Sequence, residues 1–179
     1  MHPKNTNAMN NTLFIVCPFS TMEPFLRTKF GDDAFFLTAA GAVLPQRPWD
    51  FTEAVADFLT RQRIDTICIV NDMSCRFVDA IVRRKTLHGL PVETVLEDLY
   101  VEHYNTLFRD RPLFKQQYKL AELNVLRQAH ELLESSLIGR LIADNGIAVK
   151  GLVTSRDRDL VREVPVGRNT PVYEPELAV

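Results

Sequence analysis

Residues 64–75, IDTICIVNDMSC, carry the pattern that decides the fold of this chain. Ile64 to Val70 is a largely apolar run, which is typical of a strand buried on both faces of a parallel sheet. A carboxylate and a thiol follow at Asp72 and Cys75, and helical spacing of apolar residues begins at Phe77. This order predicts a strand, a loop and a helix, which together form the repeating unit of an α/β protein.

The same order of elements occurs twice in the preceding sequence. Apolar runs at Thr12 to Cys17 and Ala34 to Ala40 predict two more strands, and the segments Thr21 to Phe30 and Phe51 to Arg63 have helical spacing. The helix after the third strand is expected at Phe77 to His88. Because crossovers between parallel strands are right-handed, this pattern predicts a central, mainly parallel sheet flanked by helices.

The second half of the sequence is mainly helical in pattern and ends in two apolar runs. Residues 92–139 keep helical spacing, with a break at residues 109–112. Ile147 to Thr154 and Leu160 to Val164 then flank the charged turn SRDRD. These runs predict a C-terminal edge strand or hairpin that completes the α/β fold.

Composition favours one domain in a reducing compartment. Of the 179 residues, 46% are hydrophobic and 25% charged, which is average for a globular protein. We expect one domain over residues 12–170, a disordered lead at 1–11 and a tail at 171–179. The net charge of -2 argues against nucleic acid and anionic membranes as partners, and no apolar run is long enough to span a bilayer. Three cysteines, an odd number, predict free thiols and a cytoplasmic protein.

Three potential metal ligands follow the first and third predicted strands. Cys17 closes the first strand, and Asp72 and Cys75 follow the third. The carboxyl ends of parallel strands meet at one edge of the sheet, where ligands bind. Zinc accepts thiolate and carboxylate ligands, and it keeps an open position when the protein supplies only three. Cys17, Asp72 and Cys75 are therefore the candidate metal ligands, with zinc as the candidate cofactor.

These motifs resemble those of the β-class carbonic anhydrases. In that family the first strand ends in Cys-x-Asp-x-Arg and a later strand ends in His-x-x-Cys-Gly; the matching stretches here are Cys17 to Thr21 (CPFST) and Asp72 to Arg76 (DMSCR). The resemblance extends over residues 12–164 and includes the ELNV motif at Glu122 to Val125. It implies the β-carbonic anhydrase fold, a homodimer or higher homo-oligomer, and a small-molecule ligand similar to CO₂ or bicarbonate.

The chain departs from the family pattern at the residues that carry the chemistry. Phe19 replaces the aspartate and Thr21 the arginine that holds it, so the dyad that orients the zinc-bound water is absent, and Thr38 and Ala39 replace an arginine-asparagine pair. Asp72 replaces a histidine ligand. A third anionic ligand would raise the pKa of zinc-bound water and lower its hydroxide fraction. We therefore expect a divergent, non-catalytic or repurposed member without normal CO₂ hydration.

Two alternative functions and a structural interpretation remain open on the sequence. An active zinc-dependent lyase or hydrolase would hydrate CO₂ or a related small electrophile at Cys17, Asp72 and Cys75. A redox sensor would form a reversible disulfide between Cys17 and Cys75. In the structural interpretation, cysteines pack as small hydrophobes, as we expect for Cys68, and Asp72 caps the helix that follows it or interacts with the dipole of that helix.

Overall fold

A five-stranded sheet forms the centre of the molecule, in the strand order β2-β1-β3-β4-β5. The computed structural model describes residues 11–45 and 49–167. The predicted tail at 171–179, and the predicted lead at 1–11 apart from its last residue, lie outside the described residues. The strands are β1 (Thr12–Val16), β2 (Phe35–Thr38), β3 (Thr66–Asp72), β4 (Ala148–Ser155) and β5 (Leu160–Val164).

Strand pairing agrees with the predicted topology. β1 lies between β2 and β3 and is parallel to both, and β3 is parallel to β4. β5 then pairs with β4 in the antiparallel sense, after the turn at Arg156–Arg158. The mainly parallel sheet and its C-terminal hairpin are therefore confirmed, and the ends of β1 and β3 lie next to each other at one edge.

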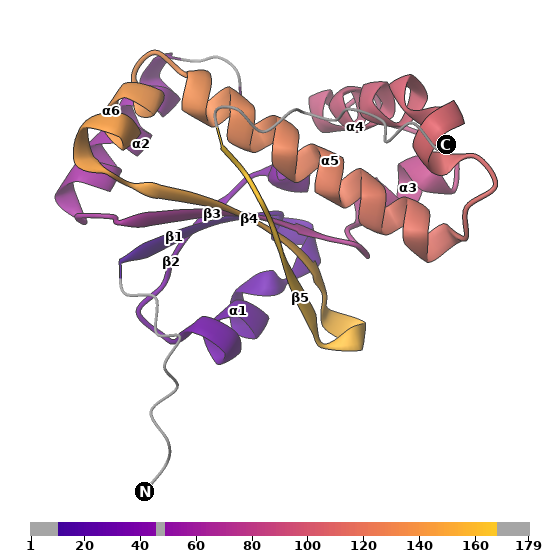
Figure 1. Ribbon diagram of the computed structural model, residues 1–179, viewed down its shortest axis with the longest axis horizontal. Coiled ribbons are helices and arrows are strands. Elements are labelled where there is room, and N and C mark those ends of the chain that lie inside the picture. The colour runs from indigo at the N-terminus through magenta and orange to yellow at the C-terminus, as the bar shows by residue number, and fades with distance from the viewer. Residues whose placement is uncertain (1–10, 46–48, 168–179) are drawn as a thin grey trace, which may run out of the picture.

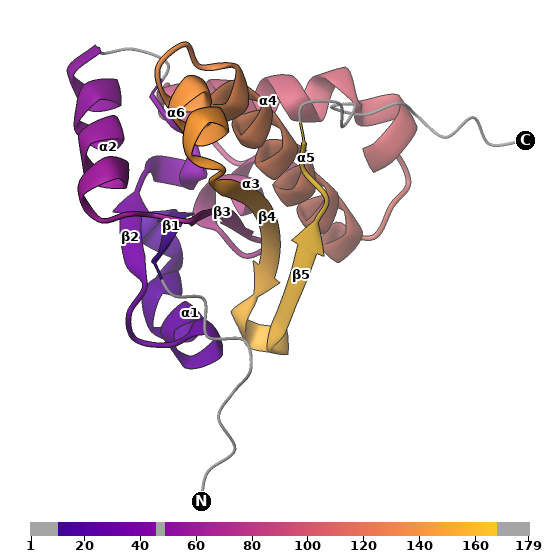
Figure 2. The same cartoon turned by 60° about the vertical axis from the view of Figure 1, so that its left-hand side comes forward.

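Helices cover both faces of the sheet. In Figures 1 and 2, α1 lies on one face, while α2, α5 and α6 lie on the other, with α3 and α4 beside α5. Among the described residues, no helix combines the length and the apolar character needed to cross a membrane. The helices are α1 (Met22–Phe30), α2 (Trp49–Arg61), α3 (Arg76–Val82), α4 (Pro91–Glu102), α5 (Leu113–Glu134) and α6 (Ile138–Asn145).

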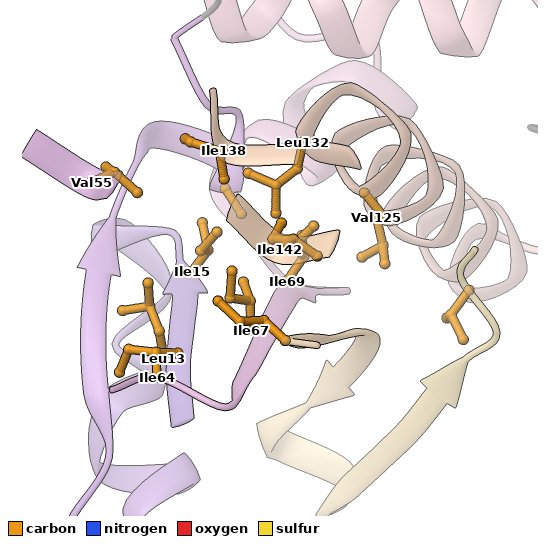
Figure 3. Close-up of a cluster of buried hydrophobic side chains, with 14 of the residues drawn as sticks. Leu13, Ile15, Val55, Ile64, Ile67, Ile69, Val125, Leu132, Ile138 and Ile142 are labelled. Carbon is orange, nitrogen blue, oxygen red and sulfur yellow. The ribbon is translucent and has the colours of Figure 1, made fainter. Parts of the chain in front are cut away.

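The alternation of side chains along the strands divides the core between these two faces. Leu13 and Ile15 of β1 point toward α2, α5 and α6, whereas Phe14 and Val16 pack against α1. Figure 3 shows the first of these clusters, in which strand residues meet helix residues. Burial of each large aliphatic side chain contributes about 1.5 to 3 kcal/mol, so these contacts hold the helices on the sheet. Cys68 of β3 belongs to the second cluster and is fully buried, as expected for a core residue.

Helix α3 ends at Val82, so the prediction that it reaches His88 was wrong. Arg84 adopts a left-handed conformation with φ of 52°. Its backbone N–H donates to the carbonyl of Ile81, and the N–H of Lys85 donates to the carbonyl of Ala80. This is a Schellman motif, which terminates the helix. Glycine usually occupies the left-handed position, and an arginine there leaves no signal in the sequence.

Candidate functional site at the ends of β1 and β3

The thiols of Cys17 and Cys75 lie in contact at the carboxyl edge of the sheet. Cys17 directly follows β1, and Cys75 is the N-cap residue of α3. The Cys75 thiol donates a hydrogen bond to Cys17 Sγ, with the sulfur atoms 3.6 Å apart. Cys17 is 3% exposed and Cys75 is fully buried. The structure thus brings together the two cysteines that the sequence placed at one edge.

A glycine turn supplies a second hydrogen-bond donor to Cys17. The N–H of Gly41, in the short helical turn Ala40–Ala42, lies 3.2 Å from Cys17 Sγ. Gly41 has φ of 62°, and a Cβ at this position would lie 2.4 Å from Val92 Cγ2. Both the backbone conformation and the close approach therefore require glycine.

Two buried asparagines hold this turn in place. Nδ2 of Asn71 and Nδ2 of Asn124 donate to the same carbonyl oxygen of Gly41, at 2.9 and 2.8 Å. Both side chains are essentially inaccessible to solvent. Sequence reasoning did not assign either asparagine to the site, although an asparagine within an apolar strand and another within a helix are signals of buried polar contacts.

Hydrogen bonding makes the two thiols unequal. The hydrogen bond from Cys75, aided by backbone N–H groups that include that of Gly41, outweighs burial and lowers the pKa of Cys17 from 9.0 to about 6. The same hydrogen bond, followed by burial, raises the pKa of Cys75 well above its ordinary value. At neutral pH the pair therefore favours a thiolate at Cys17 beside a protonated thiol at Cys75.

Asp72 is engaged by protein donors rather than grouped with the thiols. Its Oδ1 accepts hydrogen bonds from the backbone N–H and the hydroxyl of Ser74, at 2.9 and 2.6 Å. Its Oδ2 accepts a hydrogen bond from the hydroxyl of Thr154 on β4, at 3.0 Å. Asp72 is the last residue of β3 and stabilises the turn that precedes α3, so its predicted role as the helix N-cap was wrong: Cys75 holds that position.

The cysteine pair fits two positions of a zinc site but lacks a third ligand. Tetrahedral zinc with Zn–S bonds of about 2.3 Å places two thiolate sulfurs about 3.8 Å apart. The observed separation of 3.6 Å is close to that value. Within residues 11–45 and 49–167, however, no three His, Cys, Asp or Glu side chains are grouped so that they could hold a metal ion. In this arrangement Asp72 does not complete a site with Cys17 and Cys75.

Phe19 and Thr21 contribute no charged group beside the cysteines. The ring of Phe19 is about half exposed and meets the ring of Phe77 edge to face, with centroids 5.6 Å apart. The guanidinium of Arg76 lies over Phe19, 4.9 Å from the ring centroid. The Thr21 hydroxyl accepts a hydrogen bond from Arg156. An aromatic ring and a neutral hydroxyl therefore occupy the positions where the resemblance places the aspartate-arginine dyad.

The fold and the position of this site define an α/β protein with an open sheet and a thiol pair at the carboxyl ends of neighbouring strands. Solved structures similar to this chain are β-carbonic anhydrases. CafA of Aspergillus fumigatus is 24% identical, with a TM-score of 0.74 over 94% of this chain and 78% of that one. A structure from work on two tetrameric β-carbonic anhydrases of Sordaria macrospora is 18% identical to this chain, with a TM-score of 0.73 over 87% of this chain and 81% of that one.

A Coccomyxa enzyme in complex with acetazolamide is 16% identical, with a TM-score of 0.69 over 87% of this chain and 72% of that one. No protein-family profile matches the sequence, and no curated protein matches it either. The fold of this chain is that of the β-carbonic anhydrases, as the sequence resemblance predicted.

Proposed function

We propose that this protein is a divergent β-carbonic anhydrase-like protein that does not carry out normal CO₂ hydration. The engagement of Asp72 by Ser74 and Thr154 carries this proposal, because it leaves the Cys17–Cys75 pair without a third ligand from the described part of the chain. The fold and the positions of the Cys17 and Cys75 thiols support descent from the zinc site of a β-carbonic anhydrase. Phe19, Thr21 and Asp72, which replace the dyad and the histidine ligand of the resemblance, support a non-catalytic or repurposed role.

Rotating Asp72 toward the thiols would be costly. It would break three hydrogen bonds and leave the buried Thr154 hydroxyl without its carboxylate acceptor. An unsatisfied buried polar group costs about 1 to 3 kcal/mol, and a hydrogen bond to a charged group contributes about 1.5 to 3 kcal/mol. The third ligand of the predicted Cys17, Asp72 and Cys75 site is thus held by the fold in another role.

The metal content of the purified, tag-free protein tests this proposal most directly. We expect well under one zinc per chain by elemental analysis after growth with added zinc. The Cys75→Ser variant is the matched control, since it removes one thiol at the same position. A value near one zinc per chain that is lost in Cys75→Ser, together with CO₂ hydration, would instead establish the active zinc lyase with Cys17, Asp72 and Cys75 as ligands.

A thiol-based redox sensor is the second candidate function, and the contact between the two sulfurs favours it. With hydrogen peroxide as oxidant, the Cys17 thiolate would attack one oxygen to form a sulfenic acid and release hydroxide. The Cys75 thiol would then attack that sulfur, form the disulfide and release water, so that two thiols and one peroxide give one disulfide and two waters overall. The sulfur contact of 3.6 Å leaves only a short approach to the disulfide bond length of about 2.05 Å.

Intact-mass analysis after mild peroxide treatment distinguishes this candidate. A disulfide removes two hydrogen atoms, and peptide mapping should place it between Cys17 and Cys75. Cys68 is buried in a separate core cluster and serves as the internal control. Unchanged thiol content in the wild type, or equal oxidation in the Cys75→Ser variant, would exclude a disulfide sensor at this pair.

We further propose that the protein is a cytoplasmic homodimer or higher homo-oligomer. The match from Sordaria macrospora comes from work on two tetrameric β-carbonic anhydrases, which supports a homodimer or higher homo-oligomer here. The three unpaired cysteines are consistent with a cytoplasmic protein. Light scattering coupled to size-exclusion chromatography should give a mass at least twice the 20.5 kDa of one chain, whereas a monomeric mass would contradict this part.

A further inference from the structure

A hollow lies between α3, α4 and the turn Tyr104–Phe108, and its lining includes neither Cys17 nor Cys75. Its volume is about 570 Å³, within the range of small-ligand sites. The helices α3 and α4 that border it pack against each other, and Figure 1 shows where they lie beside α5. No role proposed above for the cysteine pair accounts for this hollow.

The walls of this hollow are aromatic and aliphatic. Tyr100 and Tyr104 both line it, with their rings edge to face and the centroids 5.6 Å apart. Leu87 and Val101 add aliphatic surface, and Val101 is 65% exposed. The Tyr100 hydroxyl is held by a hydrogen bond to Gln116 Oε1 of α5 at 2.8 Å, which fixes the ring. Such walls suit a ligand with an apolar body.

The hollow also contains one cation and one anion without an ion-pair partner among the described residues. Lys85, which also lines the hollow, forms a salt bridge to Asp79 at 2.6 Å. Arg84 and Glu97 line the same hollow, yet no salt bridge joins either residue to another described group or to each other. The Arg84 guanidinium instead lies over the Tyr104 ring, 5.3 Å from its centroid. Arginine binds carboxylates in a bidentate manner, and a carboxylate such as Glu97 accepts hydrogen bonds from an ammonium group.

The backbone at two sides of the hollow has unusual conformations. Arg84 has the left-handed φ of 52°, and Tyr104–Phe108 is a π-helical turn closed by the bond from Arg109 N–H to the Tyr104 carbonyl. Non-glycine residues in the left-handed region and π-helical turns are both frequent at functional sites. Here they place Arg84 and Tyr104 against the hollow.

We propose that this hollow binds an α-amino acid with an apolar side chain. Its carboxylate pairs with Arg84, its ammonium group pairs with Glu97, and its side chain packs against Tyr100 and Tyr104. A zwitterion satisfies both unpaired charges at once, which neither a simple anion nor a simple cation does. This inference is independent of the fate of the cysteine pair.

Calorimetric titration of the full chain with three related probes tests the proposal. L-phenylalanine carries both charges, 3-phenylpropionate lacks the ammonium group and 2-phenylethylamine lacks the carboxylate. We expect L-phenylalanine to bind at least about tenfold more tightly than either analogue, because each analogue leaves one protein charge unpaired. Equal affinity for all three probes, or no binding of L-phenylalanine, would overturn the proposal.

Matched variants assign the two charges. Arg84→Gln should weaken L-phenylalanine binding at least about tenfold, and Glu97→Gln should weaken it while leaving 3-phenylpropionate unaffected. Arg83→Gln is the control, since Arg83 lies one residue away, pairs with Asp79 and does not line the hollow. Equal losses in Arg83→Gln and Arg84→Gln would contradict the assignment.

A second variant separates lost binding from lost folding. Arg84→Gly places glycine where the backbone is left-handed, so the thermal midpoint should not fall, while L-phenylalanine binding should be lost. A variant that is stable and still binds L-phenylalanine as the wild type does would refute the role of Arg84.

Discussion

Cys17 couples the ionisation of the site to the stability of the protein. Its pKa falls from 9.0 to about 6 on folding, chiefly through the hydrogen bond from Cys75, whose own pKa rises. A depressed folded-state pKa contributes stability at high pH that is lost as the pH falls toward 6. The raised pKa of Cys75 has the opposite effect, because its contribution is present below pH 9 and lost above it.

The free energy of unfolding of the reduced protein should therefore rise between about pH 6 and pH 9, and the contribution of the cysteine pair should decline above that range. Urea denaturation at several pH values measures this dependence. Cys17→Ser should flatten the rise, and Cys68→Ser, which changes a cysteine outside the pair, should leave its slope in place. An equal slope in wild type and Cys17→Ser would show that Cys17 does not titrate in this window.

The residues at the ligand and dyad positions can be changed back to those of the β-carbonic anhydrases. The triple variant Phe19→Asp, Thr21→Arg, Asp72→His returns the residues that the resemblance assigns to these positions. We expect it to gain about one zinc per chain, because a neutral imidazole joins two thiolates, and to recover metal affinity more readily than CO₂ turnover. Elemental analysis measures the zinc, with the same triple change in a Cys75→Ser background as control. A triple variant that binds no metal would show that the site alignment is wrong.

At the scale of elements, the Gly41 turn connects β2 to the thiol pair. It contacts Cys17 through its N–H and is held by Asn71 and Asn124 through its carbonyl. These bonds join the end of β1, β3 and α5 at the backbone of a single residue. The site is thus organised around the backbone of a turn, which makes it sensitive to any side chain introduced there.

Gly41→Ala should destabilise the protein by about 2 to 4 kcal/mol. The added Cβ meets Val92 Cγ2 at 2.4 Å, and alanine is disfavoured at φ of 62°. Gly146→Ala is the matched control, since Gly146 has a similar φ of 64° but open space around it, and it should cost only about 1 to 2 kcal/mol. Chemical denaturation measures both variants. Equal losses would mean that the contact with Val92 carries no energy.

At the scale of the whole molecule, α5 packs directly on β4. A Cβ on Gly151 of β4 would lie 2.4 Å from Val125 Cγ1 of α5. Val125 belongs to the large core cluster and is labelled in Figure 3. A side chain at residue 151 would therefore push α5 away from the sheet. The absence of a side chain at residue 151 therefore shapes one whole face of the molecule.

Gly151→Ala should cost about 1 to 3 kcal/mol through overpacking, and Val125→Ala should cost about 1 to 3 kcal/mol through a cavity. In the double variant the alanine methyl partly fills the space left by valine, so its loss should be smaller than the sum of the single losses. Thermal or urea denaturation of the wild type, the two single variants and the double variant gives this double-mutant cycle. Strict additivity would show that the two positions are not in contact.

The sequence by itself determined the order of strands and helices, the parallel sheet and the edge where Cys17 and Cys75 meet. These features follow from local apolar patterns, because buried strands and amphipathic helices have different periodicities and parallel strands end at a common edge. The resemblance carried by the two cysteine motifs also predicted the β-carbonic anhydrase fold. The end of α3 was missed because an arginine, not a glycine, takes the left-handed position.

Only the tertiary structure decided what the polar atoms near the cysteines do. Asp72 is held by Thr154, 82 residues away in the sequence, and Gly41 is held by Asn124, 83 residues away. The hollow beside Arg84 likewise depends on how α3 packs against α4. The choice among hydrogen-bond partners depends on distances of a few tenths of an ångström and on angles between distant segments. Those are set when the layers pack together, whereas local periodicity fixes only which face each residue occupies.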